Sequence, residues 1–136
     1  MRHYKLIKLN ATKSTNDKVK MLIKSKKISS GDIVWADYQY KGRGQYKNTW
    51  NSSKGKNLLI TVYREFKGLS IKQSNYINFV ISLSVIKTIE QYIPNDNFIK
   101  WPNDILSGQK KISGILIENN IKGKELRNSI IGIGIN

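Results

Sequence analysis

The sequence contains no cysteine and only one histidine, His3. Without cysteine the chain forms no disulfide and no thiolate-metal centre, and one histidine at a terminus argues against a catalytic triad or a zinc site. Acid–base chemistry would therefore fall to lysine, aspartate, glutamate or tyrosine. A cysteine-free chain is compatible with a reducing compartment, and we expect a cytoplasmic protein.

Long apolar runs are also missing. No stretch reaches the roughly 20 apolar residues that cross a bilayer, and the opening Met-Arg-His-Tyr-Lys is not a signal peptide. We therefore expect no membrane partner. A length of 136 residues suits one domain that covers residues 1–136.

Acidic residues are scarce: 9 Asp and Glu stand against 24 Lys and Arg, which gives a formal charge of +15. Such a charge is compatible with a nucleic acid, an acidic protein or a phosphate-rich ligand as partner. The lysines are spread over nearly every segment and form no single stripe. A general compositional drift toward Lys, Ile and Asn is the second explanation, and the sequence leaves both open.

Apolar and turn residues predict a mixed fold. We expect a helix that Ser14 and Asp17 cap and that ends near Lys27, and a second helix that Ser70 and Gln73 cap and Pro94 stops. The apolar runs predict strands over 4–9, 33–36, 57–64, 98–101, 105–106, 110–118 and 126–135. Strands and helices do not alternate strictly, so the class is α+β with a mixed, mainly antiparallel sheet and a β-meander at the end.

The second expected helix is apolar over a wide arc. Tyr76, Phe79, Val80 and Leu83 recur at helical spacing, and further isoleucines and valines widen the apolar side. A helix of this kind is central to a fold, so we expect its aromatic residues in the core.

The stretch 39–50, Gln-Tyr-Lys-Gly-Arg-Gly-Gln-Tyr-Lys-Asn-Thr-Trp, has neither a helical nor a strand period. Gly42 and Gly44 let a ligand approach the main chain closely, and Arg43 offers a planar fork for carboxylate or phosphate. With the residues after Trp50 it makes a cationic loop of about eighteen residues, a length typical of functional or disordered segments. A solvated surface loop is the alternative reading of this segment alone.

Two further motifs carry groups suited to a polyphosphate. In Lys100-Trp-Pro-Asn-Asp104 the Trp-Pro corner presents an amide and a carboxylate just after a strand, and Asp104 is a candidate Mg²⁺ ligand. Lys111-Ile-Ser-Gly114 follows, with a mobile cation and room against the strand at Gly114. An ordinary surface hairpin would explain Asp104 and Lys111 equally well when they are taken alone.

Taken in order, these segments resemble the catalytic domain of biotin protein ligases. The resemblance lies in Ser14-Thr15-Asn16, in Gln39 followed by Gly42-Arg43-Gly44 and Trp50, in Lys100-Trp-Pro-Asn-Asp104, in Lys111-Ile-Ser-Gly114 and in Gly132-Ile-Gly-Ile-Asn136. It implies the fold that biotin and lipoate ligases share with class II tRNA synthetases. It also implies an enzyme that uses ATP and Mg²⁺ to form biotinyl-5′-adenylate and passes biotin to a lysine of a carboxylase carrier domain.

The resemblance assigns roles to residues of this chain. Lys111 and Arg43 would be catalytic, and the 39–50 stretch would be a mobile lid over the adenylate. Biotin would be bound by Ser14, Thr15, Asn16, Gln39, Gly42, Arg43, Gly44, Gln45, Lys111 and Gly114. ATP would be bound by Arg43, Trp50, Asn103, Asp104, Lys111 and Asn136, with the Mg²⁺ on Asp104.

The chain departs from the family pattern in two places. Gln45 and Asn48 stand where many members carry arginines, so we expect a weaker phosphate clamp. The sequence ends at Asn136, whereas the family's domain continues into further secondary structure and a small β-barrel, so we expect the last strand to leave an exposed edge.

Several alternatives stay open. They are a lipoate or octanoate ligase, a shortened inactive remnant, and a basic nucleic-acid-binding domain. We expect no DNA partner, because no helix-turn-helix precedes Tyr4, and a homodimer is compatible with the sequence.

Overall fold

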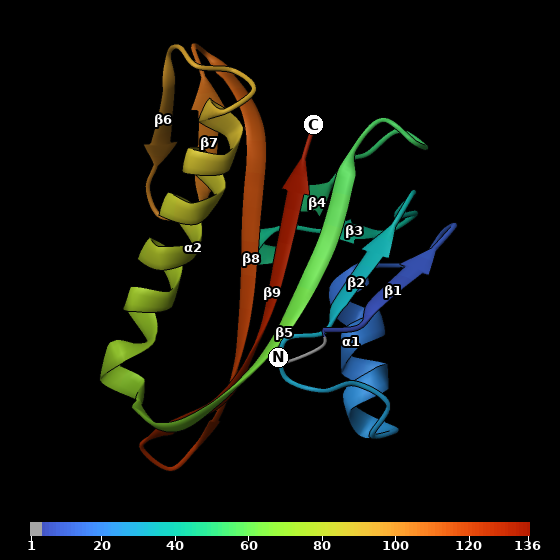
Figure 1. The fold of residues 1–136 in the computed structure, drawn as a ribbon, viewed down its shortest axis with the longest axis vertical. Coiled ribbons are helices and arrows are strands. Elements are labelled where there is room, and N and C mark those ends of the chain that lie inside the picture. Colours follow the sequence, from blue (N-terminus) through green and yellow to red (C-terminus); the bar gives the residue numbers. More distant parts are fainter. Residues whose placement is uncertain (1–3) are drawn as a thin grey trace.

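The computed structural model describes residues 4–136 (Figure 1). Short 3-10 turns, Gln45–Lys47 and Ile71–Gln73, join some of the main elements. The main elements are β1 (Leu6–Leu9), α1 (Thr15–Lys24), β2 (Ile33–Ala36), β3 (Gly42–Arg43), β4 (Thr49–Trp50), β5 (Leu58–Ser70), α2 (Ser74–Glu90), β6 (Asn97–Lys100), β7 (Asp104–Ser107), β8 (Lys110–Lys122) and β9 (Glu125–Ile135).

Seven strands form one twisted sheet in the order β1-β2-β5-β9-β8-β7-β6. Among the strands described, only the β1–β2 pair of this sheet is parallel, and every other neighbouring pair is antiparallel. This confirms the α+β class with a mixed, mainly antiparallel sheet, and β6 to β9 form the expected meander. The predicted exposed edge is wrong: β9 lies between β5 and β8 and is paired along both sides.

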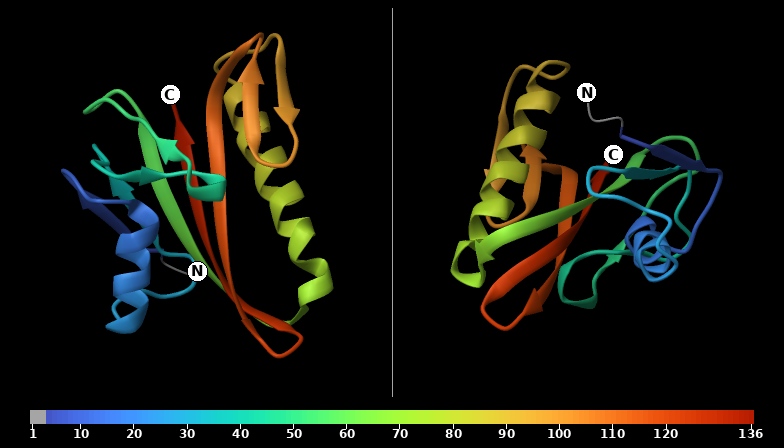
Figure 2. Two further views of the ribbon diagram at one scale, coloured as in Figure 1. Left: turned by 180° about the vertical axis from the view of Figure 1, so that it is seen from behind. Right: turned by 60° about the horizontal axis from the view of Figure 1, so that its bottom comes forward.

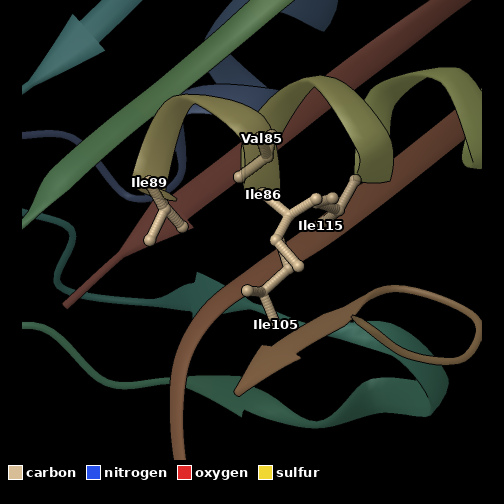
Figure 3. Packing of buried hydrophobic residues seen from close by; sticks show 5 residues of the cluster. All are labelled: Val85, Ile86, Ile89, Ile105 and Ile115. Atoms are coloured by element: carbon tan, nitrogen blue, oxygen red, sulfur yellow. The ribbon is translucent and has the colours of Figure 1, made fainter. Parts of the chain in front are cut away.

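Each face of the sheet carries one helix (Figure 2). Side chains of a strand point alternately to opposite faces, so one strand serves two layers. On one face, Ile105 of β7 and Ile115 of β8 pack against Val85, Ile86 and Ile89 of α2 (Figure 3). Against α1 pack Tyr63 of β5 and Ile130 of β9.

Helix α1 buries the face that the sequence predicts. Val19 is fully buried, and Leu22 and Ile23 pack beside it against the sheet. The predicted capping box is wrong, because within residues 4–136 the Ser14 side chain makes no capping hydrogen bond. The Ser14 hydroxyl is thus not used by the helix that it precedes.

Helix α2 is less central than its composition suggests. Val85, Ile86 and Ile89 enter the core, but Tyr76, Phe79, Val80 and Leu83 are each about half exposed or more. The expected core position of the aromatic residues Tyr76 and Phe79 is wrong, because the sequence of a helix that is apolar all round does not show which arc meets the sheet. The Ser70–Gln73 capping box is confirmed, although it caps the 3-10 turn that leads into α2.

The glycine-rich stretch 39–50 is not irregular. Gly42 pairs with Trp50 and Arg43 with Thr49, so β3 and β4 form a short hairpin that we call the 39–50 hairpin. It lies on the same face of the sheet as α1 (Figure 2). None of the helices within residues 4–136 is long and apolar enough to cross a membrane.

Candidate functional site

A cavity of about 240 Å³ lies between the 39–50 hairpin, the start of α1 and the middle of the sheet. This is slightly below the roughly 300–1,000 Å³ of typical small-molecule sites. Its lining is formed by Ser14, Thr15, Asn16, Gln39, Arg43, Gly44, Gln45, Tyr46, Asn48, Thr49, Trp50, Ile60, Asn103, Asp104, Lys111, Gly114, Ile115, Leu116, Gly132, Ile133 and Gly134.

The hairpin is held over the cavity by Arg43. Its guanidinium donates to both carboxylate oxygens of Glu118 on β8, at 3.0 and 2.8 Å. Its Nη2 also lies 2.8 Å from an oxygen of Asp17 on α1. A two-pronged Arg–carboxylate contact fixes orientation as well as charge. The hairpin is thereby tied to both α1 and β8.

Glu118 gathers three donors. Arg43, the Lys20 ammonium at 2.7 Å and the Asn16 amide at 3.0 Å all donate to its oxygens. Burial by itself would raise the pKa of Glu118, but the hydrogen bonds from Arg43, Lys20 and Asn16 outweigh it and lower that pKa to about 2. The hydrogen bond to Glu118 in turn raises the pKa of Arg43, with burial opposing it. Both groups are therefore charged at neutral pH.

Trp50 lies flat on two glycines of the sheet. An added methyl would meet the indole ring 2.6 Å away at Gly114 of β8 and 2.5 Å away at Gly134 of β9. Only residues without a side chain leave space for a ring at this point. The buried Trp50 Nε1 has no hydrogen-bond partner within residues 4–136, so the indole keeps a free donor in the site.

Lys111 reaches the cavity because β8 contains a bulge. Ile105 of β7 pairs with Ser113 and Leu106 with Lys111, so Ile112 is an extra residue on β8. In a regular strand Lys111 and Gly114, three residues apart, would face opposite sides; the bulge turns both toward the site. The Lys111 ammonium lies 2.7 Å from Asp104 and 5.5 Å from the centre of a Trp50 ring.

The start of α1 forms a polar wall. Gln39 Oε1 accepts hydrogen bonds from the Thr15 amide at 2.7 Å and from the Thr15 hydroxyl at 2.9 Å. Thr61 of β5, fully buried, lies 2.7 Å from both Thr15 Oγ1 and Asn16 Oδ1. Asn16 also donates to Leu116 O and to Glu118. These contacts leave the Ser14 hydroxyl and the Gln39 amide nitrogen as the groups of this wall best able to meet a ligand.

Most of the residues predicted from the sequence meet in this cavity, and two do not line it. Gly42 lies at the start of the hairpin, where an added methyl would meet Trp50 O. Asn136 is exposed, and its side chain accepts a hydrogen bond from Asn57 at 2.8 Å. Asn103 lines the cavity but is tied to Ile115 through its side chain and its backbone. The binding roles assigned to these residues stay predictions.

Asp104 is the only carboxylate among the described residues that line the cavity. Within residues 4–136 no three His, Cys, Asp or Glu side chains cluster as a metal cage. A single carboxylate fits the usual way in which proteins bind Mg²⁺, where one or two carboxylates, the substrate's phosphates and water hold the ion together. Asp104 would then have to share its charge between Lys111 and the ion.

Sequence reasoning assigned no role to Glu118, Thr61 or Gly134, although Gly134 stands within the quoted motif Gly132-Ile-Gly-Ile-Asn136. Glu118 is the single acidic residue of an isoleucine-rich strand, four residues after Gly114. Strand alternation places both on the face of the site, so this signal was available. Thr61 offered no such signal, since a threonine in an apolar strand is ordinary.

The sequence comparisons identify one family. Residues 9–136 match the model of the biotin/lipoate A/B protein ligase family. The bifunctional ligase/repressor BirA of Bacillus subtilis is 34% identical over 106 residues, which cover 78% of this chain and 32% of that protein. Biotin–protein ligase 2 of Arabidopsis thaliana is 33% identical over 115 residues, covering 80% and 34%. The chain thus spans about a third of the length of these relatives.

Solved structures agree. The biotin protein ligase of Leishmania major in complex with biotinyl-5-AMP superposes with a TM-score of 0.81 at 27% identity, covering 99% of this chain and 58% of that one. The Aquifex aeolicus enzyme in complex with biotin and ATP gives 0.76 at 31% identity, covering 98% and 53%. The predicted resemblance is therefore confirmed, and the chain belongs to the biotin/lipoate A/B protein ligase family.

Proposed function

We propose that this chain is the activating part of an ATP-dependent biotin protein ligase. The observation that carries the proposal is the meeting, in one cavity, of Lys111, the Arg43 hairpin and the polar start of α1. Relatives named as biotin protein ligases, and neighbours in complex with biotin, ATP or biotinyl-5-AMP, support the choice of ligands.

The reaction brings two anions together. A carboxylate oxygen of biotin attacks the α-phosphorus of ATP, the bond from that phosphorus to the pyrophosphate oxygen breaks, and biotinyl-5′-adenylate and pyrophosphate result. Lys111 is the cavity cation best placed to neutralise the carboxylate and phosphate oxygens, since its ammonium lies between Asp104 and Trp50. Bound with ATP, Mg²⁺ would neutralise phosphate oxygens, with Asp104 as its protein ligand.

The remaining residues would orient the ligands. Ser14, Thr15, Asn16 and Gln39 would surround the ureido end of biotin, and the Ser14 hydroxyl and the Gln39 amide nitrogen would make the direct hydrogen bonds. Gly114 gives the ligand room against β8, and Trp50 would stack on adenine. Because the cavity is small for biotin and a nucleotide together, the 39–50 hairpin or the Trp50 ring would move when the adenylate forms.

The second step would release AMP. The amine of a lysine on a carboxylase carrier domain attacks the acyl carbon of the adenylate, loses a proton and forms an amide, and the phosphate oxygen of AMP takes the bonding electrons. The hairpin over the mixed anhydride would limit its hydrolysis before the carrier arrives. This activity suits a cytoplasmic enzyme.

Calorimetry on the 136-residue chain with biotin and with lipoate tests the substrate. We expect biotin to bind more tightly; tighter binding of lipoate overturns the biotin assignment in favour of the lipoate branch of the family. Biotin-dependent exchange of pyrophosphate into ATP then tests activation, and labelling of a carrier domain tests transfer. Biotin binding without either reaction would identify an inactive remnant.

A further inference from the structure

Arg43 is a predicted catalytic cation, yet its charge is already matched inside the protein. One guanidinium nitrogen donates to Glu118 and the other lies 2.8 Å from both Glu118 and Asp17. The remaining nitrogen, Nε, is buried and has no hydrogen-bond partner within residues 4–136. An arginine held by two carboxylates is oriented before any ligand arrives.

The base of the 39–50 hairpin is tied to the segment before α1, since Tyr40 N donates to Thr12 O at 3.1 Å and Lys41 N donates to Lys13 O at 3.0 Å. Beyond Lys41, the backbone hydrogen bonds of the stretch within residues 4–136 are internal to it. Its ladder has two residue pairs, and among the described strands β3 and β4 pair only with each other. A ladder this short is not stable alone in water. Tyr46 at the tip is 91% exposed and contributes almost no apolar burial. Beyond Lys41 the hairpin is therefore anchored by its side chains, of which Arg43 and Trp50 reach the sheet.

The two anchors are coupled through the ladder. Arg43 pairs with Thr49, and the next pair joins Gly42 to Trp50, so the guanidinium contacts and the indole stand one pair apart. Loss of the Arg43 contacts would release one side of the ladder and loosen the seat of Trp50 on Gly114 and Gly134. The carboxylates under Arg43 thus control where the proposed adenine-stacking ring lies.

We propose that Glu118, assisted by Asp17, is a positioning residue of this site: it fixes Arg43 and thereby seats the 39–50 hairpin and Trp50 over the cavity. Its effect on ATP and biotin rests on the proposed function, whereas its effect on the hairpin does not. Glu118 is suited to the task because its two oxygens join β8, α1 and β3 through Asn16, Lys20 and Arg43. Its side chain is 24% exposed, which shields the contact in part from water.

The test begins without ligands and uses Glu118→Gln. In a Trp35→Phe, Trp101→Phe background, Trp50 emission reports the seat of the indole, and chymotrypsin cleavage after Tyr46 reports opening of the hairpin. We expect cleavage to rise roughly tenfold and Trp50 emission to shift, since each charge-assisted contact contributes more than a neutral one even when partly exposed. Cleavage at aromatic residues outside the 39–50 hairpin should stay unchanged, because the sheet remains folded.

Two variants make the result specific. Arg43→Gln should match Glu118→Gln, and the double variant should add less than threefold to either one, because both remove the same contact. Lys20→Met removes another partner of Glu118 and leaves Arg43 untouched, so its cleavage after Tyr46 should stay within twofold of the parent protein. If Glu118→Gln does not fold, Asp17→Asn removes the second carboxylate and should raise cleavage severalfold.

Ligand measurements complete the test. For Glu118→Gln we expect the KM of ATP to rise roughly tenfold, with kcat reduced less, because affinity scales with the fraction of seated hairpin. Parental cleavage and parental Trp50 emission in Glu118→Gln would overturn the positioning role. Absence of biotin binding to the parent protein would overturn the proposed function instead, and the ligand-free measurements would still decide on Glu118.

Discussion

Gly134→Ala is the sharpest test of the site, because the structure sets the size of the conflict. A methyl at Gly134 would lie 2.5 Å from Trp50 Cε2 and 2.6 Å from Cζ2, whereas ordinary contact begins at 3.4 Å. Both atoms belong to a rigid ring, so the indole has to shift as a whole. The required displacement is roughly 1 Å, which a packed interior resists.

The magnitude follows from overpacking. Insertion of one methyl into a packed contact costs about 1–3 kcal/mol when neighbours have to move. Here the cost can be met by lifting Trp50 off the sheet, because the indole belongs to the hairpin and not to the strands. We therefore expect a small fall in melting temperature and a large change at the hairpin, with ATP affinity reduced roughly tenfold if Trp50 stacks on adenine.

The assay combines thermal unfolding, Trp50 fluorescence in the Trp35→Phe, Trp101→Phe background, and ATP titration. Gly44→Ala is the matched control for stability and fluorescence: it lies in the same hairpin, and its added methyl would be 3.5 Å from Asn48, an ordinary contact. If Gly134→Ala leaves the fluorescence of Trp50 and the ATP affinity at their parental values, the indole does not occupy this position, and the reasoning about the glycine pair is refuted.

Three further outcomes are expected. Lys111→Ala should slow adenylate formation by at least about 100-fold. The melting temperature should stay nearly unchanged, because the Lys111 side chain in the ion pair with Asp104 is 45% exposed. A large fall in melting temperature would instead make Lys111 a structural residue. Thr61→Val removes a buried hydroxyl that contacts Asn16 and should lower the free energy of unfolding by about 1–3 kcal/mol in a denaturant titration, whereas Thr61→Ser, which keeps the hydroxyl, should lose less. The pKa of Glu118 falls from 4.5 to about 2 on folding, so its contribution to stability is fully present above about pH 4.5 and is lost as the pH falls toward 2. The difference in stability between the parent protein and Glu118→Gln, followed by circular dichroism, should therefore shrink between these pH values. A difference that does not depend on pH would contradict the assigned cause.

The sequence predicted those features that depend on local pattern. Strand β2 has the predicted bounds, and the end of α2 before Pro94 follows from a rule about one residue type. The family motifs located the glycine hairpin and Lys111 before any contact was known. Features that depend on pairing across the chain were not predictable in this way.

Three such features changed the interpretation. β9 is central because β5 and β8 both pair with it, and neither partner can be read from β9 itself. The bulge at Ile112 turns the Lys111 side chain into the site, but no residue pattern in the sequence around Ile112 marks a bulge. The exposed arc of α2 at Tyr76 and Phe79 is as apolar as its buried arc, so periodicity could not separate the two.

The pairing of the site's cations also revises the meaning of the overall charge. Although the chain carries a formal +15, Arg43 in the cavity wall faces Asp17 and Glu118, and Lys111 faces Asp104. The site is therefore close to neutral, and the excess lysines lie outside it, where they can attract anions over a distance without binding them in a defined geometry. In the proposed reaction, a ligand carboxylate or phosphate would have to compete with Asp104 for Lys111. That competition would lower the affinity for other nearby anions, but it would keep the ammonium oriented before the reaction, and an oriented charge is the form in which electrostatic catalysis is most effective.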